Sequence, residues 1–251
     1  MSKIELKKKI DKLMEEWANY CHRPQSPWTD SIFVKDGAFP FYEQQEPKIL
    51  FIARELYGKQ NKEDGLCINY WDERAGMDNL GVFQSRLLYL AYGIINGQCT
   101  LQDWLNMQEA KELDNSFAKS NETTETKTFS YAFMNASKIL NIQGTQIGDT
   151  FQGFINDSEN LKFIIEEIRL LNPNIIVSAN LGDLGLMGKL MTFSNSIKQK
   201  QADNLLNNEN RFIYCFDDKI PWIDTWHFSA HKDHFKGFYE PVCEAAKILL
   251  G

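Results

Sequence analysis

The chain has 251 residues with 43% apolar and 24% charged side chains, a composition that is typical of a folded globular protein and excludes intrinsic disorder. Its formal net charge of -7 excludes a protein that coats nucleic acid non-specifically, because such binding depends on neutralising many phosphates, although a local basic groove is still allowed. No apolar run approaches the length that crosses a membrane.

The cysteines indicate a reducing compartment. They are scattered and form no Cys-x-x-Cys pair, so the sequence predicts neither a zinc ribbon nor a metal cluster. An odd number of cysteines without a signal peptide is typical of reduced thiols, and we expect a cytoplasmic protein. The five cysteines are Cys21, Cys67, Cys99, Cys215 and Cys243.

Residues 1–46 are predicted to form an N-terminal extension. Apolar side chains between positions 2 and 21 recur at helical spacing, with lysines and glutamates on the other faces, which predicts an amphipathic helix that packs on another element. Residues 22–47 are rich in proline and aromatic side chains, which favours an ordered wrapping segment over a free linker. The remaining residues, 47–251, are predicted to form an α/β domain.

The stretch 47–76 is expected to carry the chemistry. A short apolar run at 49–53 follows a proline and predicts a strand buried on both faces. A loop with charged and aromatic side chains begins directly after it. Because ligands bind at the carboxyl ends of strands in an open α/β sheet, this loop is the first candidate site. Its candidate residues are Arg54, Glu55, Tyr57, Gly58, Asp64 and Trp71.

The rest of the chain alternates between helical and strand patterns, which predicts a parallel sheet with helices on both faces. A lysine-bearing polar stretch, 189–200, is most simply a solvated face, and 194–210 is expected to be polar and mobile. Helices are predicted at 79–96, 101–113, 158–171, 182–191 and near the C-terminus, and strands at 129–135, 175–179, 212–216 and 222–226.

Polar side chains stand where three of these strands end. Glu55 follows the first strand, Asn135 ends the second, and His227 with Ser229 follows the last. If the strands are parallel neighbours, these groups converge on one crevice. His231 and His234 lie nearby, but their spacing with a carboxylate is not that of a metal site, and no metal is predicted.

Four motifs in sequence order resemble those of the uracil-DNA glycosylase superfamily, most closely its iron-sulfur branch. Residues 54–58 (Arg-Glu-Leu-Tyr-Gly) match the branch's Gly-Glu-Ala-Pro-Gly, and 63–76 resemble the Glu-Asp segment that follows it. Residues 134–138 (Met-Asn-Ala-Ser-Lys) match Thr-Asn-x-x-Lys, and 225–230 (Thr-Trp-His-Phe-Ser-Ala) match Thr-x-His-Pro-Ser/Ala. A fifth likeness, to a helix-strand unit, covers 173–182. The resemblance implies a three-layer α/β/α sandwich around a central, mainly parallel four-stranded sheet.

The chain also departs from that pattern. The cluster cysteines are absent, so no iron-sulfur centre and no other cofactor is expected. Arg54 stands where the family has glycine, and Phe228 where it has proline. Another branch positions water with an aspartate where this chain has Leu56, so a carboxylate role would fall to Glu55 or Asp64.

The resemblance implies a monofunctional DNA glycosylase, and the residue types suit that chemistry. Hydrolysis of the base–sugar bond builds positive charge on the sugar and negative charge on the base, so a carboxylate (Glu55) and a neutral histidine donor (His227) are the predicted catalytic residues. The flipped base would stack on Trp71 and be recognised by the Asn135 amide. Residues predicted to bind substrate are Tyr57, Gly58, Asp64, Trp71, Asn135 and Ser229, and those predicted to hold DNA phosphates are Arg54, Ser229, Lys232 and Lys236.

The resemblance also bears on substrate range. Strict uracil enzymes place a tyrosine against C5 of the base, whereas this chain has Gly58 there. Pyrimidines substituted at C5 are therefore expected substrates, including the bulky modified cytosines of phage genomes, which would place the enzyme in repair or in antiviral defence. We expect a monomer that acts on DNA.

Two other functions remain open at this point. One is a catalytically inactive protein of the same fold that binds nucleic acid or a protein partner. The other is a hydrolase of free nucleosides or nucleotides. Without the resemblance, a lone asparagine such as Asn135 is more often a cap or turn residue, and a tryptophan such as Trp71 is more often a core or rim aromatic.

Overall fold

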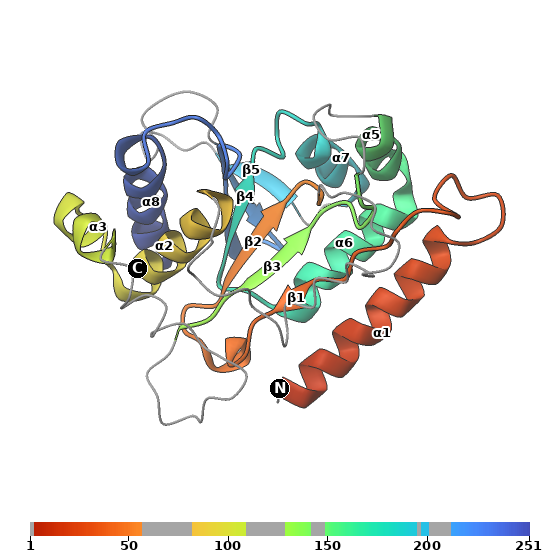
Figure 1. Ribbon diagram of the computed structural model, residues 1–251, viewed down its shortest axis with the longest axis horizontal. Helices are drawn as coiled ribbons and strands as arrows, with labels where there is room; N and C mark the ends of the chain where they lie inside the picture. Colours follow the sequence, from red (N-terminus) through yellow and green to blue (C-terminus); the bar gives the residue numbers. More distant parts are fainter. Residues whose placement is uncertain (1–2, 57–81, 109–128, 142–148, 195–196, 201–211) are drawn as a thin grey trace.

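A computed structural model of the chain describes residues 3–56, 82–108, 129–141, 149–194, 197–200 and 212–251. These residues form a mixed α/β fold in which helices lie on both faces of one mixed sheet (Figure 1). Seven strands can be described, in the order β1-β3-β2-β4-β7-β6-β5. The sheet is therefore larger than the four-stranded sheet that the family resemblance implies, and it has two more strands than the five that the apolar pattern predicts.

Four strands at the centre of the sheet run parallel, and three flanking strands run antiparallel to their neighbours. The parallel strands are β2 (Ile49–Ala53), β3 (Ala132–Asn135), β4 (Ile175–Ala179) and β7 (Ile220–Thr225). The flanking strands are β1 (Gly37–Ala38), β5 (Ile197–Lys200) and β6 (Phe212–Phe216). The predicted strand 222–226 begins two residues earlier, because Ile220 and Pro221 already pair with β6.

Strand β5 corrects the prediction that residues 189–200 are simply a solvated face, and it places a strand within the stretch 194–210 that the sequence described as polar and mobile. Ile197 is buried, whereas Lys198 is exposed. A strand at the edge of a sheet buries only one face, so a polar sequence with a single apolar residue is enough to form it.

The side chains of the central strands alternate between two cores, as the pleat of a strand requires. In β2, Leu50 and Ile52 face one core, and Ile49, Phe51 and Ala53 face the other. Helices α1 (Lys3–Cys21), α5 (Asp149–Asn156), α6 (Ser158–Leu171) and α7 (Leu186–Phe193) cover the first core, and helices α2 (Val82–Asn96), α3 (Leu101–Gln108) and α8 (Glu240–Leu250) cover the second.

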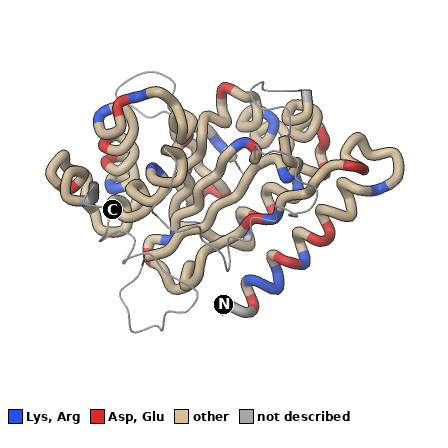
Figure 2. The backbone as a smooth tube through the Cα atoms, in the orientation of Figure 1, with Lys and Arg blue, Asp and Glu red and all other residues tan. Residues whose placement is uncertain are grey.

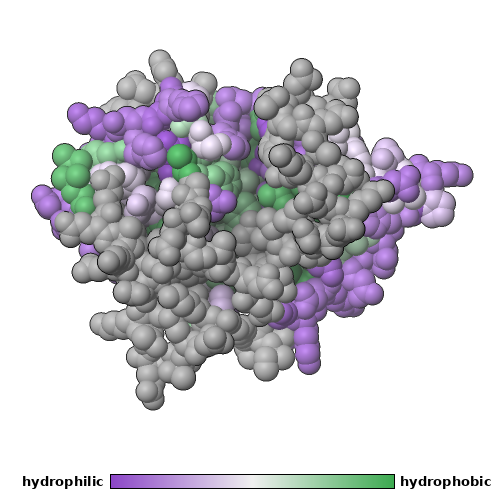
Figure 3. Space-filling view, in the orientation of Figure 1, coloured by the Kyte–Doolittle hydropathy of each residue, from purple (hydrophilic) through white to green (hydrophobic). Residues whose placement is uncertain are grey.

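Helix α1 packs against α6 and shares its core with the sheet. The Trp17 ring stacks on Phe163 with centroids 5.2 Å apart, and its Nε1 donates to Oδ1 of Asn160 at 2.8 Å. The other side of α1 carries alternating lysines and acidic residues (Figure 2) and forms a hydrophilic area at the lower right of the surface (Figure 3). None of the helices in the described ranges is long and apolar enough to cross a membrane.

A buried cluster of charges joins three segments beneath α1. The Nζ atom of Lys138, just after β3, lies 2.5 Å from Oδ1 of Asp36 and 2.7 Å from Oε2 of Glu167 on α6. All three side chains are fully buried, and Lys138 Nζ also lies 5.2 Å from the centre of the Trp17 ring. Burial raises the pKa of Glu167 well above its ordinary value, although the Lys138 charge opposes this.

Removing the cation from this cluster is expected to destabilise the fold strongly. Lys138→Met should lower the free energy of unfolding by about 3–5 kcal/mol, because Asp36 would stay buried without its counter-ion. Urea unfolding followed by circular dichroism measures the change. Adding Asp36→Asn to Lys138→Met should recover part of the loss, since only one of the two buried carboxyl groups, that of Glu167, would then lack its counter-ion.

The matched control is Lys162→Met, which removes an exposed lysine that pairs with Glu159 on α6. Exposed pairs contribute about 0–1 kcal/mol, so this variant should unfold close to the wild type. Equal stability of the Lys138 and Lys162 variants would show that the buried cluster does not hold the fold.

Candidate active site

The carboxyl ends of the parallel strands bring three predicted site residues to one edge of the sheet. Residues Ala53 and Asn135 are partners in the β2–β3 register, Glu55 follows β2, and His227 follows β7. The chain leaves β2 for β3 on one side and then crosses to β4 on the other. Such a reversal opens a crevice at the carboxyl ends of the strands, which is where ligands bind in open α/β sheets.

The Glu55 carboxylate is held at this edge by two neighbours. Its Oε1 lies 2.9 Å from Nε of Arg54 and accepts a hydrogen bond from Nδ2 of Asn141 at 3.2 Å. The side chain is fully buried. Burial raises the pKa of Glu55 above its ordinary value, while the hydrogen bond from Asn141 and the Arg54 charge oppose the shift. A carboxylate with a raised pKa and one cationic neighbour is suited to acid–base or electrostatic catalysis.

The His227 ring is held in one tautomer. Its Nδ1 lies 2.8 Å from Oγ of Ser229 and accepts the backbone N–H of Ser229 at 3.3 Å. Because an N–H group can only donate, Nδ1 is the acceptor, and the neutral ring carries its proton on Nε2. Burial lowers the pKa of His227, and the positive charges of Arg54 and Arg86 lower it further. The contacts therefore favour a neutral imidazole that carries its N–H group on Nε2.

Arg86 of α2 fixes the loop that carries His227. Its Nη1 donates to the carbonyl oxygens of Phe228 at 2.9 Å and Ala230 at 2.8 Å, and its Nη2 donates to that of Lys232 at 3.2 Å. Arg86 is buried, and its guanidinium lies 4.7 Å from the centre of the Phe238 ring. Sequence analysis missed this residue. The available signal was an arginine directly before two buried leucines of an apolar helix.

Phe83, near the start of α2, connects the ends of β3 and β7. The centre of its ring lies 6.0 Å from that of His227, 5.9 Å from that of Phe133 and 5.4 Å from that of Phe228. The sequence predicted a helix over 79–96 but gave Phe83 no role in the site, so its place beside the imidazole was not predicted. The half-buried ring is the aromatic side chain nearest His227 for which the structure gives a contact.

Asn135 is buried, and its polar contacts are with Asp36. Its backbone N–H donates to Oδ2 of Asp36 at 2.5 Å, and its Nδ2 lies 3.4 Å from the same atom. Since Asp36 also binds Lys138, the end of β3 is anchored in the buried charge cluster. The structure thus gives Asn135 a structural partner, and its predicted role in reading a base stays a prediction.

The loop after His227 carries the predicted phosphate ligands at the surface. Lys232 and Lys236 are exposed, and Nζ of Lys232 lies 4.1 Å from the centre of the Trp226 ring. The Lys236 backbone N–H donates to Oδ1 of Asp233 at 2.6 Å. Ser229 is exposed, but the described contact of its hydroxyl is with His227, so it positions the imidazole.

Four predicted site residues, Tyr57, Gly58, Asp64 and Trp71, lie outside the residues that the structure describes. Within the described ranges, no group of three His, Cys, Asp or Glu side chains is arranged to hold a metal ion. The candidate site therefore consists of Arg54, Glu55, Asn141, Phe83, Arg86, His227 and Ser229.

Comparisons with known proteins identify no relative. No protein-family model, no curated protein and no solved structure matches the chain. The resemblance to the uracil-DNA glycosylase superfamily therefore rests on the short sequence motifs alone.

Removing the Arg86 guanidinium is expected to loosen the His227 loop. Arg86→Met should lower the free energy of unfolding by about 2–4 kcal/mol, because one buried and two part-buried hydrogen bonds to carbonyl oxygens are lost. It should also speed amide hydrogen exchange at Ala230 and Lys232, whose N–H groups bond within the loop. Mass spectrometry of exchanged peptides measures this local effect.

Arg169→Met is the matched control, because Arg169 is an exposed arginine paired with Asp217. That variant should leave exchange in the loop unchanged. Unaltered loop exchange in Arg86→Met as well would contradict the assigned role of Arg86.

Proposed function

We propose that this protein is a monofunctional DNA glycosylase that hydrolyses the N-glycosidic bond of uracil or of a C5-modified pyrimidine and leaves an abasic site. The observation that carries this proposal is the state of His227. Its pKa is lowered by burial and by two arginines, its Nδ1 faces Ser229, and it lies at the same sheet edge as the buried carboxylate of Glu55. This pair of groups matches the two charges that develop when a base leaves its sugar.

In the proposed reaction, the bond between the base nitrogen and C1′ of the deoxyribose breaks and the oxygen of water bonds to C1′. The sugar becomes cation-like in the transition state, and the ionised Glu55 carboxylate would stabilise it or take a proton from the water. The released pyrimidine carries the electron pair of the broken bond. A donor to its carbonyl oxygen stabilises that negative charge, and Nε2–H of His227 supplies such a donor.

The same surroundings would hold the charges in their active forms. The cationic groups Arg54 and Arg86 disfavour protonation of His227, so the ring stays neutral at neutral pH. Arg54 also lies against the Glu55 carboxylate and favours its ionised form. Arg54 thus favours the neutral form of His227 and the ionised form of Glu55.

Recognition of DNA would use the aromatic and basic groups around this pair. A glycosylase must flip its target base out of the stack and hold it against a flat side chain. Phe83 beside His227 supplies an aromatic ring for that purpose, in addition to Trp71, which the sequence predicted. Lys232 and Lys236 on the neighbouring loop would neutralise phosphates. A local positive site of this kind is possible although the net charge of the whole chain is -7.

Entry of a substrate would require movement at this edge, because Glu55 and Asn135 are buried. The proposed family is expected to have a mainly parallel four-stranded sheet. The parallel strands β3, β2, β4 and β7 are compatible with that core, and β1, β5 and β6 would be additions to it.

Loss of either proposed catalytic group should abolish base release while the protein still folds. We expect Glu55→Gln and His227→Ala to lower the single-turnover rate by roughly 100- to 1,000-fold, as the loss of one transition-state contact typically does. Activity of the wild type should fall as the pH drops through the raised pKa of Glu55, because the protonated acid no longer stabilises a cation. Cleavage of oligonucleotides at abasic sites by alkali measures the rate.

The matched controls are Glu166→Gln on α6 and His231→Ala in the same loop, both of which change exposed residues. They should keep full activity. Undiminished base release in the Glu55 and His227 variants would contradict the mechanism, and a wild type that binds DNA without releasing any base would instead favour the non-catalytic alternative.

The substrate range is tested with single- and double-stranded oligonucleotides that carry uracil, a thymine mispair or a C5-substituted cytosine. If Gly58 leaves space at C5, we expect release of at least one C5-substituted base at a rate comparable to that of uracil. Strict preference for uracil would contradict the open pocket. Equal turnover of a free nucleoside and an oligonucleotide would contradict a role for the basic loop and favour a nucleoside hydrolase.

A further inference from the structure

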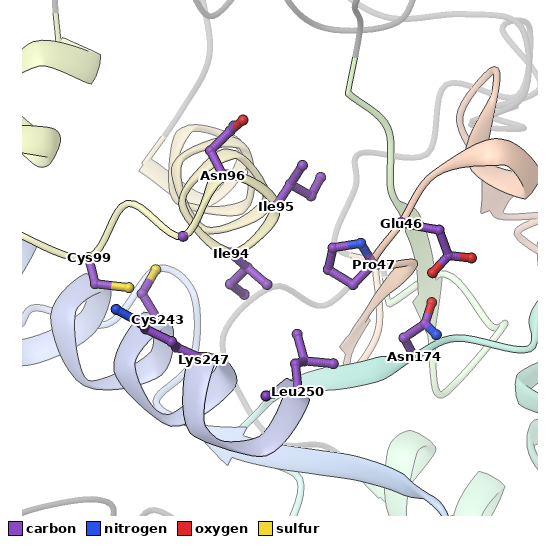
Figure 4. A pocket seen from close by; sticks show the side chains of 12 residues that line it. Glu46, Pro47, Ile94, Ile95, Asn96, Cys99, Asn174, Cys243, Lys247 and Leu250 are labelled. Carbon is purple, nitrogen blue, oxygen red and sulfur yellow. The ribbon is translucent and has the colours of Figure 1, made fainter.

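Two thiols face one cavity at the amino edge of the sheet, opposite the candidate active site. The cavity has a volume of about 540 Å³ and lies between the end of α2, helix α8 and the segments that lead into β2 and β4. Cys99 reaches it from the turn between α2 and α3, and Cys243 reaches it from α8 (Figure 4). Both are free cysteines, and Cys99 is the more exposed of the two.

The turn that carries Cys99 is fixed against α8. Gly97 adopts a positive φ of 64° at the end of α2, and the backbone N–H of Gln98 donates to the carbonyl oxygen of Gly93 at 2.9 Å. The hydroxyl of Tyr239 donates to the carbonyl oxygen of Gln98. A side chain at Gly93 would collide with Tyr239, since a Cβ there would lie 2.2 Å from its hydroxyl oxygen. These contacts fix the turn that carries Cys99 next to the segment that leads into α8, the helix that carries Cys243.

The pair is chemically asymmetric. A hydrogen bond from Cys243 lowers the pKa of the Cys99 thiol, and the charge of Lys247 lowers it further, although burial opposes both. Burial raises the pKa of Cys243 well above its ordinary value. Cys99 is partly exposed and lines the cavity, so it is the thiol that an oxidant reaches first, and a lowered pKa favours its attack; the neighbouring thiol then resolves the product.

We propose that Cys99 and Cys243 form a peroxide-responsive dithiol whose disulfide joins the α2–α3 turn to α8. The Cys99 sulfur attacks the O–O bond of a hydroperoxide, which forms the sulfenic acid of Cys99 and releases an alcohol or water. The Cys243 sulfur then attacks the Cys99 sulfur, and its proton leaves with the hydroxyl group as water. Two electrons pass from the two thiols to the peroxide, and the protein loses two hydrogen atoms.

This reaction is independent of the proposed glycosylase activity, and its expected effect is on stability. A disulfide between positions 99 and 243 closes a long loop of chain, and such cross-links stabilise the folded state relative to the unfolded one. For a protein of this size, the oxidised form should melt roughly 5 °C or more above the reduced form. Dithiothreitol should reverse the shift.

The experiment uses the full chain treated with hydrogen peroxide. Mass spectrometry of a non-reduced digest should find the Cys99 peptide joined to the Cys243 peptide, and differential scanning fluorimetry should show the rise in melting temperature. In Cys243→Ala, dimedone should label Cys99 as a sulfenic acid. In Cys99→Ala, the shift in melting temperature should disappear. Cys215→Ala, which removes a buried thiol of β6, should behave as the wild type.

Two results would overturn the proposal. One is a wild-type digest in which Cys99 and Cys243 stay unlinked while peroxide modifies other thiols. The other is a melting shift that persists in Cys99→Ala. The first result is measured on the wild type and the second on Cys99→Ala, a variant at a partly exposed position. Both can therefore be obtained even if Cys243→Ala does not fold.

Discussion

The buried cation of Lys138 is the interaction on which the arrangement of this chain depends. It holds Asp36 of the N-terminal segment and Glu167 of α6 to the end of β3, and all three side chains are fully buried. Burying charges costs free energy that only close pairing offsets, so the three segments cannot shift independently. The same Asp36 accepts the backbone N–H of Asn135, and the carboxyl end of β3 is thereby fixed.

A second buried cation, Arg86, fixes the loop that follows β7, the outermost parallel strand on the other side of the core from β3. Arg86 accepts no hydrogen bonds and has donors enough for several carbonyl oxygens, so one side chain holds the three carbonyls of the loop after β7. This anchor fixes the loop in which Ser229 faces His227 Nδ1 and the His227 ring lies beside Phe83. Two buried cations thus fix the carboxyl edge of the parallel strands, Lys138 behind β3 and Arg86 behind β7, and the proposed chemistry takes place at this edge.

The sequence predicted the parts of this structure that local patterns control. The apolar runs of β2 and β4 gave their boundaries without error, because strands buried on both faces contain only apolar or small residues. It also placed His227 and Glu55 at strand ends. It missed β1 and β5, since two- and four-residue edge strands carry almost no pattern of their own. Arg86 and Phe83 were missed because their partners are about 140 residues or 50 residues away in the chain, and no local spacing encodes such contacts.

Helix α2 connects the two edges of the sheet and places distinct chemistry at its two ends. Phe83 and Arg86 lie near its start at the carboxyl edge, and Cys99 lies just past its end beside the amino-edge cavity. A helix of 15 residues spans about 22 Å, so the thiols are remote from the proposed catalytic pair. Helix α8 packs beside α2 and follows the His227 loop in the chain. A covalent bond between the ends of α2 and α8 would therefore restrain the same two helices that support the loop, without placing any atom in the site itself.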